Sequence, residues 1–365
     1  MMYRRKKSIK IITIHCIPNF GSLLQSYGLL QFLKSNGYDV SIINYCPYYY
    51  TFGRHPFRKF LGTILNFYEY IKQQQILNRF QKDFLQIEAP KIKRYSGLSI
   101  YSDEKNIFIA GGDQLWNSHH PCGNDDAYKL TFVKNGYKLS YGTSIGRNNL
   151  TDSEIIELVK KTNDFISIGL REQSTVPMLS KFSQTAIYHA ADPVLLLGKQ
   201  DYMHFIKDER LIKENYILVY LAPKSELLAT TVKVLAKSKG LKVVHCLGRS
   251  KKIDYDYIFK SNSPQEMLNL IYYADYVVSA SFHATVFSVL FEKQFCTLLP
   301  EANTNIRIMD WLNYCDLGNR IITNESEIVN VKDEIDFKPV TNKVNSLAHI
   351  SRKRLIEEIE KCIEI

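Results

Sequence analysis

The sequence predicts an α/β protein built from two Rossmann-like domains that face each other across a cleft. Its length of 365 residues favours two domains rather than one. Short β-rich runs alternate with segments of helical periodicity along most of the chain, which is typical of doubly wound sheets. The same order of strand, turn and helix recurs in the second half, so a ligand cleft is expected between the halves.

The first half opens on a β-loop-α-β unit. Residues 10–14 form a short β-rich run, and residues 18–21 (PNFG) supply a turn. Apolar residues then recur at helical spacing up to Gly37, a residue typical of the position just past a helix end. Residues 40–45 (VSIINY) predict the next strand.

The remaining elements of the first half follow the same alternation. Helices are expected over the aromatic, glutamine-rich stretch at residues 67–84 and after the capping box Thr151-x-x-Glu154. Further strands are expected at residues 106–110 (NIFIA), 138–146 (KLSYGTSIG) and 165–170 (FISIGL).

The second half begins after a predicted hinge at residues 192–202. Helices are expected at residues 225–238, after Ser263-Pro264, after His283 and over residues 344–362. Strands are expected at residues 216–221, 242–247, 276–281 and 295–299. We therefore predict an N-terminal domain over residues 1–195, a C-terminal domain over residues 196–345 and a C-terminal helix over residues 346–365.

Composition narrows the class of protein. Hydrophobic residues make up 45% and charged residues 23%, as in soluble enzymes, and no run reaches the roughly 18–20 apolar residues of a membrane span. The apolar run near the N-terminus is short, is broken by Lys10 and His15, and lacks a cleavage site, so we expect a cytoplasmic protein. Seven dispersed cysteines without a C-x-x-C pair argue against a disulfide framework or a zinc site, and no metal is expected.

The net charge of +10 indicates an anionic partner. Nucleic acid is not expected, because no signature of a nucleic-acid-binding module is present. Phosphorylated ligands and anionic membrane surfaces both fit this charge. The basic cluster at residues 4–7 (RRKK) is either a solvated strand entry or a site of peripheral docking at the inner membrane face.

Polar residues follow two predicted strands of the first half, where ligands bind in open α/β sheets. Asn19 either donates to a ligand or caps the following helix. Asp113 and Gln114 lie beside Trp116, and this set suits the hydroxyl edges and the C–H face of a sugar ring. The alternative is a turn with an aspartate cap and a core tryptophan.

Cationic residues follow other strands. Arg171 can hold a phosphate or carboxylate in bidentate fashion, or form a local ion pair with Glu172. His283 stands where a strand hands over to a helix; a bound phosphate would keep it protonated as a general acid, and the alternative is a buried, hydrogen-bonded histidine. Arg307 and Arg320 add two cations downstream, with helix solvation or a structural ion pair as the alternative.

Taken in this order, these stretches resemble the polysaccharide pyruvyl transferase family. The resemblance runs from about residue 11 to about residue 321. This chain has Ser281 where some members carry an arginine, so one expected anion contact is missing, and Arg307 and Arg320 are the candidates to compensate for it. The matching elements are residues 19–21 (NFG), 111–117 (GGDQLWN), 141–146 (YGTSIG), 167–172 (SIGLRE), 192–196 (DPVLL), 281–288 (SFHATVFS) and 305–308 (NIRI).

The resemblance implies a GT-B-like fold and an enzyme that transfers pyruvate from phosphoenolpyruvate to a sugar, forming a ketal. The acceptor is expected to be a polysaccharide or its lipid-diphosphate-linked precursor, and no cofactor is implied besides phosphoenolpyruvate as co-substrate. Two other functions stay open: a GT-B glycosyltransferase that uses a nucleotide sugar, and a non-catalytic carbohydrate-binding protein.

The resemblance also assigns roles to the candidate residues. His283 is the expected general acid. The donor, phosphoenolpyruvate, is expected to bind Arg171, Arg307, Ser281 and Thr285. The sugar acceptor is expected to bind Asn19, Asp113, Gln114 and Trp116.

Overall fold

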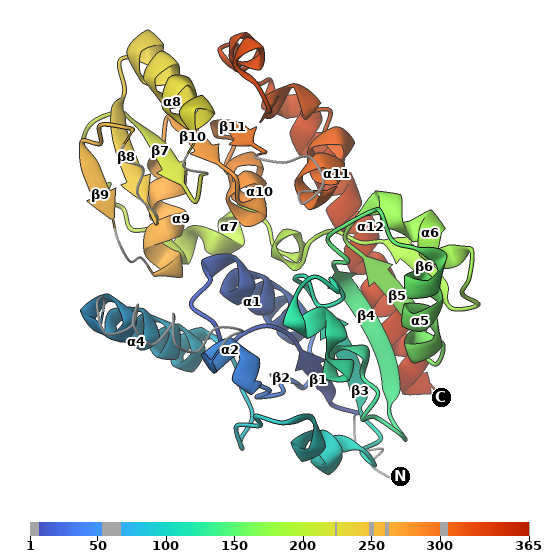
Figure 1. Cartoon of the computed structure of the whole chain (residues 1–365). Helices are drawn as coiled ribbons and strands as arrows, with labels where there is room; N and C mark the ends of the chain where they lie inside the picture. Colours follow the sequence, from blue (N-terminus) through green and yellow to red (C-terminus); the bar gives the residue numbers. More distant parts are fainter. Residues whose placement is uncertain are drawn as a thin grey trace. The chain divides into compact units, whose positions relative to one another are not determined.

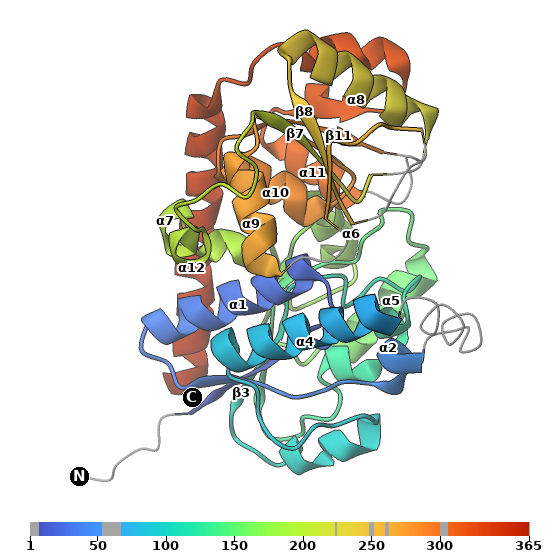
Figure 2. The same ribbon diagram turned by 90° about the vertical axis from the view of Figure 1, so that its left-hand side faces the viewer.

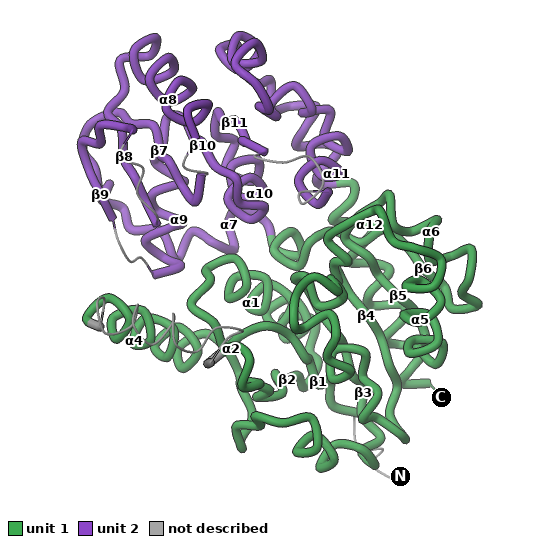
Figure 3. Tube along the Cα trace, in the orientation of Figure 1, with its two compact units in different colours: residues 1–197, 346–365 green, residues 198–345 purple. Residues whose placement is uncertain are grey.

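A computed structural model of the chain describes residues 7–52, 67–222, 225–247, 252–259, 263–299 and 306–364 (Figure 1). The basic residues 4–6 of the N-terminal cluster lie outside the described residues. The chain divides into two compact units, of which unit 1 holds residues 1–197 and 346–365 and unit 2 holds residues 198–345 (Figure 3). The division thus falls between residues 197 and 198, where the sequence predicts 195 and 196, and residues 346–365 belong to unit 1.

Unit 1 is built on a parallel sheet of six strands in the order β2-β1-β3-β4-β5-β6. The inner strands are buried along nearly their whole length, because helices cover both faces of a parallel sheet. This explains their almost continuous apolar sequences. The strands are β1 (Ile9–Ile12), β2 (Val40–Ile42), β3 (Ile107–Gly111), β4 (Tyr137–Thr143), β5 (Ser167–Leu170) and β6 (Ala186–His189).

Three helices of unit 1 lie where the sequence predicts them. The short helices Tyr48–Phe52 and Val176–Ser180 were not predicted, and the C-terminal helix begins at Phe337 rather than at residue 344. The capping box of Thr151 and Glu154 is present at the start of α5. Tyr27 of α1 packs edge-on against Phe80 and Phe84 of α4, so these two helices lie side by side (Figure 2). The helices are α1 (Phe20–Ser35), α2 (Tyr48–Phe52), α4 (Phe67–Phe84), α5 (Asp152–Thr162), α6 (Val176–Ser180) and the part of α12 (Phe337–Glu364) from residue 346 onward.

Unit 2 repeats this architecture with a second parallel sheet, in the order β12-β11-β10-β7-β8-β9. Its strands are β7 (Tyr216–Tyr220), β8 (Lys242–Cys246), β9 (Tyr257–Phe259), β10 (Tyr276–Ser279), β11 (Gln294–Leu298) and β12 (Ile321–Ile322). Its helices are α7 (Lys199–Tyr202), α8 (Glu226–Lys239), α9 (Pro264–Tyr273), α10 (Phe282–Leu290), α11 (Ile306–Tyr314) and the first part of α12.

Each unit is therefore Rossmann-like, and the predicted fold class is confirmed. In each sheet the loops that follow the strands emerge at the same edge, because all strands run in parallel. None of the helices within the described residues is long and apolar enough to cross a lipid bilayer.

Candidate functional site

The donor residues of unit 2 lie at the N-terminus of α10, directly after β10. Ser281 is the N-cap: its hydroxyl accepts the N–H of Ala284 at 3.4 Å, and its own N–H donates to the Ser279 hydroxyl at 2.9 Å. This turn places His283 in the first turn of the helix. The first N–H groups of a helix have no partner within it and favour an anion.

Arg307 and His283 both contact the phenyl ring of Phe282. The Arg307 guanidinium lies 5.7 Å from the ring centroid of Phe282, and the imidazole of His283 packs edge-on to that ring with centroids 5.2 Å apart. Arg307 is half-buried at the start of α11, and His283 is 6% exposed. Unit 2 thus gathers a cation and an imidazole beside the N-terminus of one helix.

The side chains of Thr285 and Arg320 form hydrogen bonds with other residues of unit 2. The Thr285 hydroxyl donates to the Ser281 carbonyl at 3.0 Å and lies 3.0 Å from the Thr297 hydroxyl of β11. Arg320 is 3% exposed and donates to the Asp333 carbonyl at 2.8 Å. Of the two downstream arginines, Arg307 is therefore the one that the structure places against α10, whereas Arg320 holds the backbone near Asp333.

In unit 1, the loop after β3 carries Asp113 in a strained backbone conformation. Gly112 and Asp113 have φ angles of 66° and 55°, and a Cβ at Gly112 would come within 1.7 Å of Gln25 Oε1. The Asp113 carboxylate accepts the Ser22 hydroxyl at 2.5 Å and the N–H of Gln114 at 2.8 Å. Asp113 is 8% exposed, so its carboxylate is fixed by α1 and by its own loop.

Asn19 and Gln114 are less buried than Asp113. Asn19 is exposed and caps α1, because its side-chain oxygen accepts the N–H of Ser22 at 3.2 Å. Gln114 is half-buried, and its side-chain oxygen accepts from Asn117 at 2.7 Å. Since Ser22 also donates to Asp113, α1 connects the predicted acceptor residues Asn19 and Asp113.

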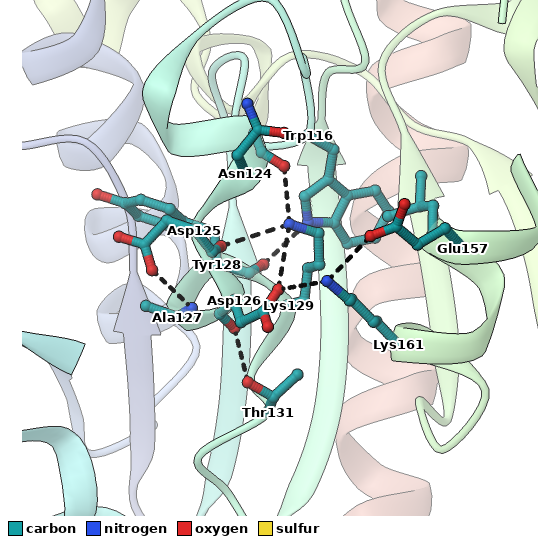
Figure 4. Close-up of polar contacts among 12 residues, drawn as sticks. Trp116, Asn124, Asp125, Asp126, Ala127, Tyr128, Lys129, Thr131, Glu157 and Lys161 are labelled. Atoms are coloured by element: carbon teal, nitrogen blue, oxygen red, sulfur yellow. Dashed lines mark hydrogen bonds and ion pairs between the residues drawn. The ribbon is translucent and has the colours of Figure 1, made fainter. Parts of the chain in front are cut away.

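Trp116 lies in the core, which corrects the expectation that its indole lines the acceptor side. The side chain is 3% exposed, and its ring packs edge-on against Phe165 with centroids 6.1 Å apart. The indole N–H donates to the Tyr128 carbonyl at 2.9 Å (Figure 4). The alternative of a core tryptophan is therefore the one the structure has.

Lys129 stabilises the loop that packs on Trp116 (Figure 4). Its amine is buried and donates to the Gly123 carbonyl at 2.8 Å, while the Asp126 carboxylate lies 3.8 Å away. Burial lowers the pKa of Lys129. Asp126 in turn accepts from Lys161 of α5 at 2.9 Å, so this loop is tied to a helix of the same unit.

Arg171 lies among carboxylates, which corrects the expectation that it faces an anionic ligand. It is 6% exposed, donates to Asp192 at 2.6 Å and lies 4.0 Å from Glu172. Burial by itself lowers the pKa of Arg171, but the charges of Asp192, Glu172 and Asp113 raise it above its ordinary value. The local ion pair with Glu172 foreseen as an alternative is present, and Asp192 is the nearer partner.

The carboxylate of Glu172 extends this network to the segment after β4. It accepts the N–H of Ile145 at 3.1 Å and the hydroxyl of Ser144, and the N–H of Ser144 donates to the Asp113 carbonyl at 2.8 Å. The segments around Asp113, Ser144, Glu172 and Asp192 therefore meet in one buried network of hydrogen bonds and ion pairs. This network fixes the loop that carries Asp113.

A polar cluster that follows β1 and β2 was not predicted from the sequence. His15 Nε2 lies 3.7 Å from the sulfur of Cys46, and Asn44 contacts both side chains. The available signal was that polar residues follow two strands that pair in the sheet. Among the described residues, no group of three or more His, Cys, Asp and Glu side chains is arranged to hold a metal ion.

Solved structures with the same fold define the class of the chain. MnaA of S. aureus in a co-structure with UDP has a TM-score of 0.58 at 10% identity, over 98% of this chain and 97% of that chain. UDP-GlcNAc 2-epimerase of Methanocaldococcus jannaschii with UDP-GlcNAc and UDP has a TM-score of 0.56 at 12% identity, over 96% and 99%. The Neisseria meningitidis UDP-GlcNAc 2-epimerase bound to UDP-GlcNAc has a TM-score of 0.56 at 10% identity, over 97% and 100%. The likeness shows the fold alone: two Rossmann-like domains of the GT-B-like class.

A family model described as polysaccharide pyruvyl transferase matches residues 19–301. This range is more than half of the chain, so the protein belongs to that family, as its sequence elements predict. The match includes the elements around Asn19, Asp113 and His283, whereas Arg307 lies beyond it. The comparison with curated proteins gives no match.

Proposed function

We propose that this chain transfers the pyruvyl group of phosphoenolpyruvate to a sugar and forms a ketal. Family membership supports pyruvyl transfer. The observation that carries the assignment of residues is the position of Arg307 and His283 against Phe282, at the N-terminus of α10. These groups are the proton donor and the cation that phosphoenolpyruvate requires.

The chemistry begins with proton transfer. His283 donates a proton to the methylene carbon of phosphoenolpyruvate, and positive charge develops at C2. A sugar hydroxyl attacks C2 and loses its proton, which restores the protonated imidazole. Phosphate then leaves with its bonding electron pair, and a second hydroxyl attacks C2 to close the ketal. The proton of this second hydroxyl passes to the departing phosphate. The products are the ketal and inorganic phosphate, so this reaction needs no redox cofactor.

The donor carries two anionic groups, and unit 2 offers two kinds of anion partner. We assign the Arg307 guanidinium to one of these groups and the first N–H groups of α10 to the other. Ser281 and Thr285 act by fixing the start of α10, since their hydroxyls already bond within the unit. Arg171 acts in unit 1 by holding the network beneath the Asp113 loop.

On the acceptor side we assign Asn19, Asp113 and Gln114 as residues that bind the sugar. Another feature of unit 1 supports an acceptor that carries negative charge. Tyr48 of α2 is 42% exposed, and Lys93 and Arg94 lie 5.6 and 5.8 Å from its ring centroid. An aromatic face beside cations suits a saccharide with a diphosphate, such as a lipid-linked precursor at the inner membrane face in the cytoplasm.

The test uses the purified full-length chain. Thermal-shift titration should show stabilisation by phosphoenolpyruvate and not by UDP or UDP-sugars. Phosphate should be released when phosphoenolpyruvate and a polysaccharide or lipid-linked acceptor are mixed. Preferential stabilisation by a UDP-sugar would instead favour a nucleotide-sugar glycosyltransferase, which the ligands named in the structures of similar fold make the main rival. Binding of carbohydrate without phosphate release would favour a non-catalytic role.

A further inference from the structure

Two stretches of unit 1 without acidic residues run side by side where β2 ends. Residues 40–68 and 89–102 contain no aspartate or glutamate, and each stretch holds three lysines or arginines. Tyr45 pairs with Ile92 in a parallel bridge, and the N–H of Cys46 donates to the Ile92 carbonyl at 2.7 Å. The two stretches therefore leave the sheet together, and acidic residues of their own do not balance their positive charge.

The short helix α2 presents a tyrosine ring to solvent at this place. The hydroxyls of Tyr45 and Tyr49 both donate to the Asp125 carboxylate, at 2.7 and 2.8 Å, and so fix the segment that carries the start of α2. Tyr48 lies between these two anchors in the chain and is 42% exposed. The contacts of the neighbouring tyrosines therefore hold the Tyr48 ring at the surface.

Three exposed cations follow on the neighbouring stretch, at Lys91, Lys93 and Arg94. The charged groups of Lys93 and Arg94 lie 5.6 and 5.8 Å from the ring centroid of Tyr48. Among the residues that the structure describes, none of the three cations forms an ion pair. Tyr95 comes next in the chain and is 41% exposed. Tyrosine rings beside lysines and arginines are typical of surfaces that contact the headgroups of a bilayer.

The first turns of α4 carry more exposed apolar side chains, and Figure 1 shows this helix at the periphery of unit 1. Gln81 anchors α4, because its amide donates to the His15 carbonyl at 2.7 Å. A helix rises 1.5 Å per residue, so Tyr68 lies about 20 Å along the axis from that anchor. Tyr68 is 76% exposed, and Tyr70 and Ile71 are 39% and 37% exposed. The first turns of α4 are therefore available to an external partner.

We propose that Tyr48, residues 91–95 and residues 68–71 form a surface that docks unit 1 on an anionic lipid bilayer. We call it the tyrosine–cation surface. Its cations contact the headgroup phosphates, and its tyrosine rings lie at the depth of the headgroups, with one apolar face and one polar tip each. A second copy of this chain is a poorer occupant, because it would bring the same cations face to face.

Docking at this surface has a consequence for the acceptor. Tyr48 follows β2 and Asn19 follows β1, and the loops after parallel strands emerge at the same edge of a sheet. A lipid-linked acceptor would thus reach Asn19 while its lipid stays in the bilayer, a consequence that rests on the proposed function. Docking itself needs neither phosphoenolpyruvate nor an acceptor, so it is tested without them.

The first test floats the full-length protein with lipid vesicles in a density gradient. Vesicles of equal parts phosphatidylcholine and phosphatidylglycerol should carry the protein, vesicles of phosphatidylcholine alone should carry much less, and added salt should weaken the binding. Equal binding to both kinds of vesicle would overturn the proposal. Failure to bind the anionic vesicles, with binding of inorganic pyrophosphate or duplex DNA instead, would also overturn it.

A charge variant locates the surface. Lys91→Gln, Lys93→Gln and Arg94→Gln in one chain should lower the partition coefficient on anionic vesicles roughly 100-fold, since each cation near such a bilayer strengthens binding about 5-fold. An unchanged partition coefficient would assign membrane contact to another part of the chain, such as residues 4–7, and overturn the proposal. The matched control removes three exposed lysines of unit 2 and should bind as the wild type does. It carries Lys233→Gln, Lys237→Gln and Lys332→Gln.

A fluorescent reporter tests the part that α4 plays. Tyr68→Trp adds an indole at a 76% exposed position, whereas the native Trp116 and Trp311 are 3% and 7% exposed. Brominated phosphatidylcholine in the anionic vesicles should quench the added indole. Ile350→Trp, at a 58% exposed position of α12, is the matched control and should not be quenched. Quenching of Tyr68→Trp that does not exceed that of the control would overturn the proposal.

Discussion

Arg171 donates to the carboxylate of Asp192 across 2.6 Å, and both side chains are buried in unit 1. The two residues lie at the ends of different segments of the chain, after β5 and before the short turn that starts at Pro193. Asp192 also accepts the N–H of Val194 at 3.0 Å, so the ion pair is tied to the backbone of the turn after Asp192. The arginine thus acts on the fold of unit 1.

Replacing Arg171 should therefore reduce stability. Arg171→Met leaves Asp192 and Glu172 as buried carboxylates without their guanidinium, and loss of one partner of a buried pair typically costs about 3–5 kcal/mol. Urea denaturation of the variant should show a free energy of unfolding lower by that amount. An unchanged unfolding midpoint, with weakened phosphoenolpyruvate binding, would return Arg171 to the donor side.

Replacing Arg307 should affect binding instead. Arg307→Gln removes a charge that packs on Phe282, and the free energy of unfolding should change by about 1 kcal/mol or less. The loss of a hydrogen bond to a charged group predicts a KM for phosphoenolpyruvate raised roughly 10–100-fold. Steady-state kinetics at saturating acceptor measure this, and a wild-type KM would remove Arg307 from the proposed donor side.

His283→Gln tests the proton donor. Glutamine keeps hydrogen-bonding capacity at a 6% exposed position but cannot act as a general acid at neutral pH. The rate of phosphate release should fall about 10²–10⁴-fold, while the thermal shift with phosphoenolpyruvate is retained. Near-normal turnover by the folded variant would eliminate the role.

Glu88 should make unit 1 sensitive to acid. Burial alone raises the pKa of Glu88, but hydrogen bonds from Lys10, Tyr101 and Ser41 lower it below its ordinary value of 4.5. The folded pKa lies below the unfolded one, so the stabilisation is present above pH 4.5 and is lost as the pH falls through the folded pKa. Glu88→Gln should be less stable at pH 7 and lose less stability on acidification, as measured by urea denaturation at both pH values. Parallel pH dependence in both proteins would exclude this role.

Local patterns sufficed for most of the fold. Buried parallel strands such as Ile107–Gly111 can be recognised in the sequence as apolar runs, and N-cap residues such as Thr151 indicate where helices start. The edge strands β6, β9 and β12 were not predicted from the sequence, because Tyr257–Phe259 is partly exposed and Ile321–Ile322 spans two residues. Such strands owe their conformation to pairing with a neighbour and carry little hydrophobic signal of their own.

The candidate site was harder to predict because its partners are remote in sequence. Nothing around Arg171 reveals that Asp192, 21 residues on, neutralises it. An indole after a glycine-rich loop suits a sugar or a core equally well, and only the fold places Trp116 against Phe165. His15 and Cys46 are 31 residues apart and come together through the pairing of β1 with β2.

Unit 2 is a single continuous stretch inserted into unit 1, whose last piece is the end of α12. Ser351 accepts the N–H of Ala191 at 2.9 Å, and Arg352 donates to the carbonyls of Leu195 and Leu196. On the ribosome, unit 1 must therefore wait for residues 346–365 before it can complete its packing, although its residues 1–197 are translated long before them. A premature stop codon just before residue 346 would consequently damage the domain that was synthesised first.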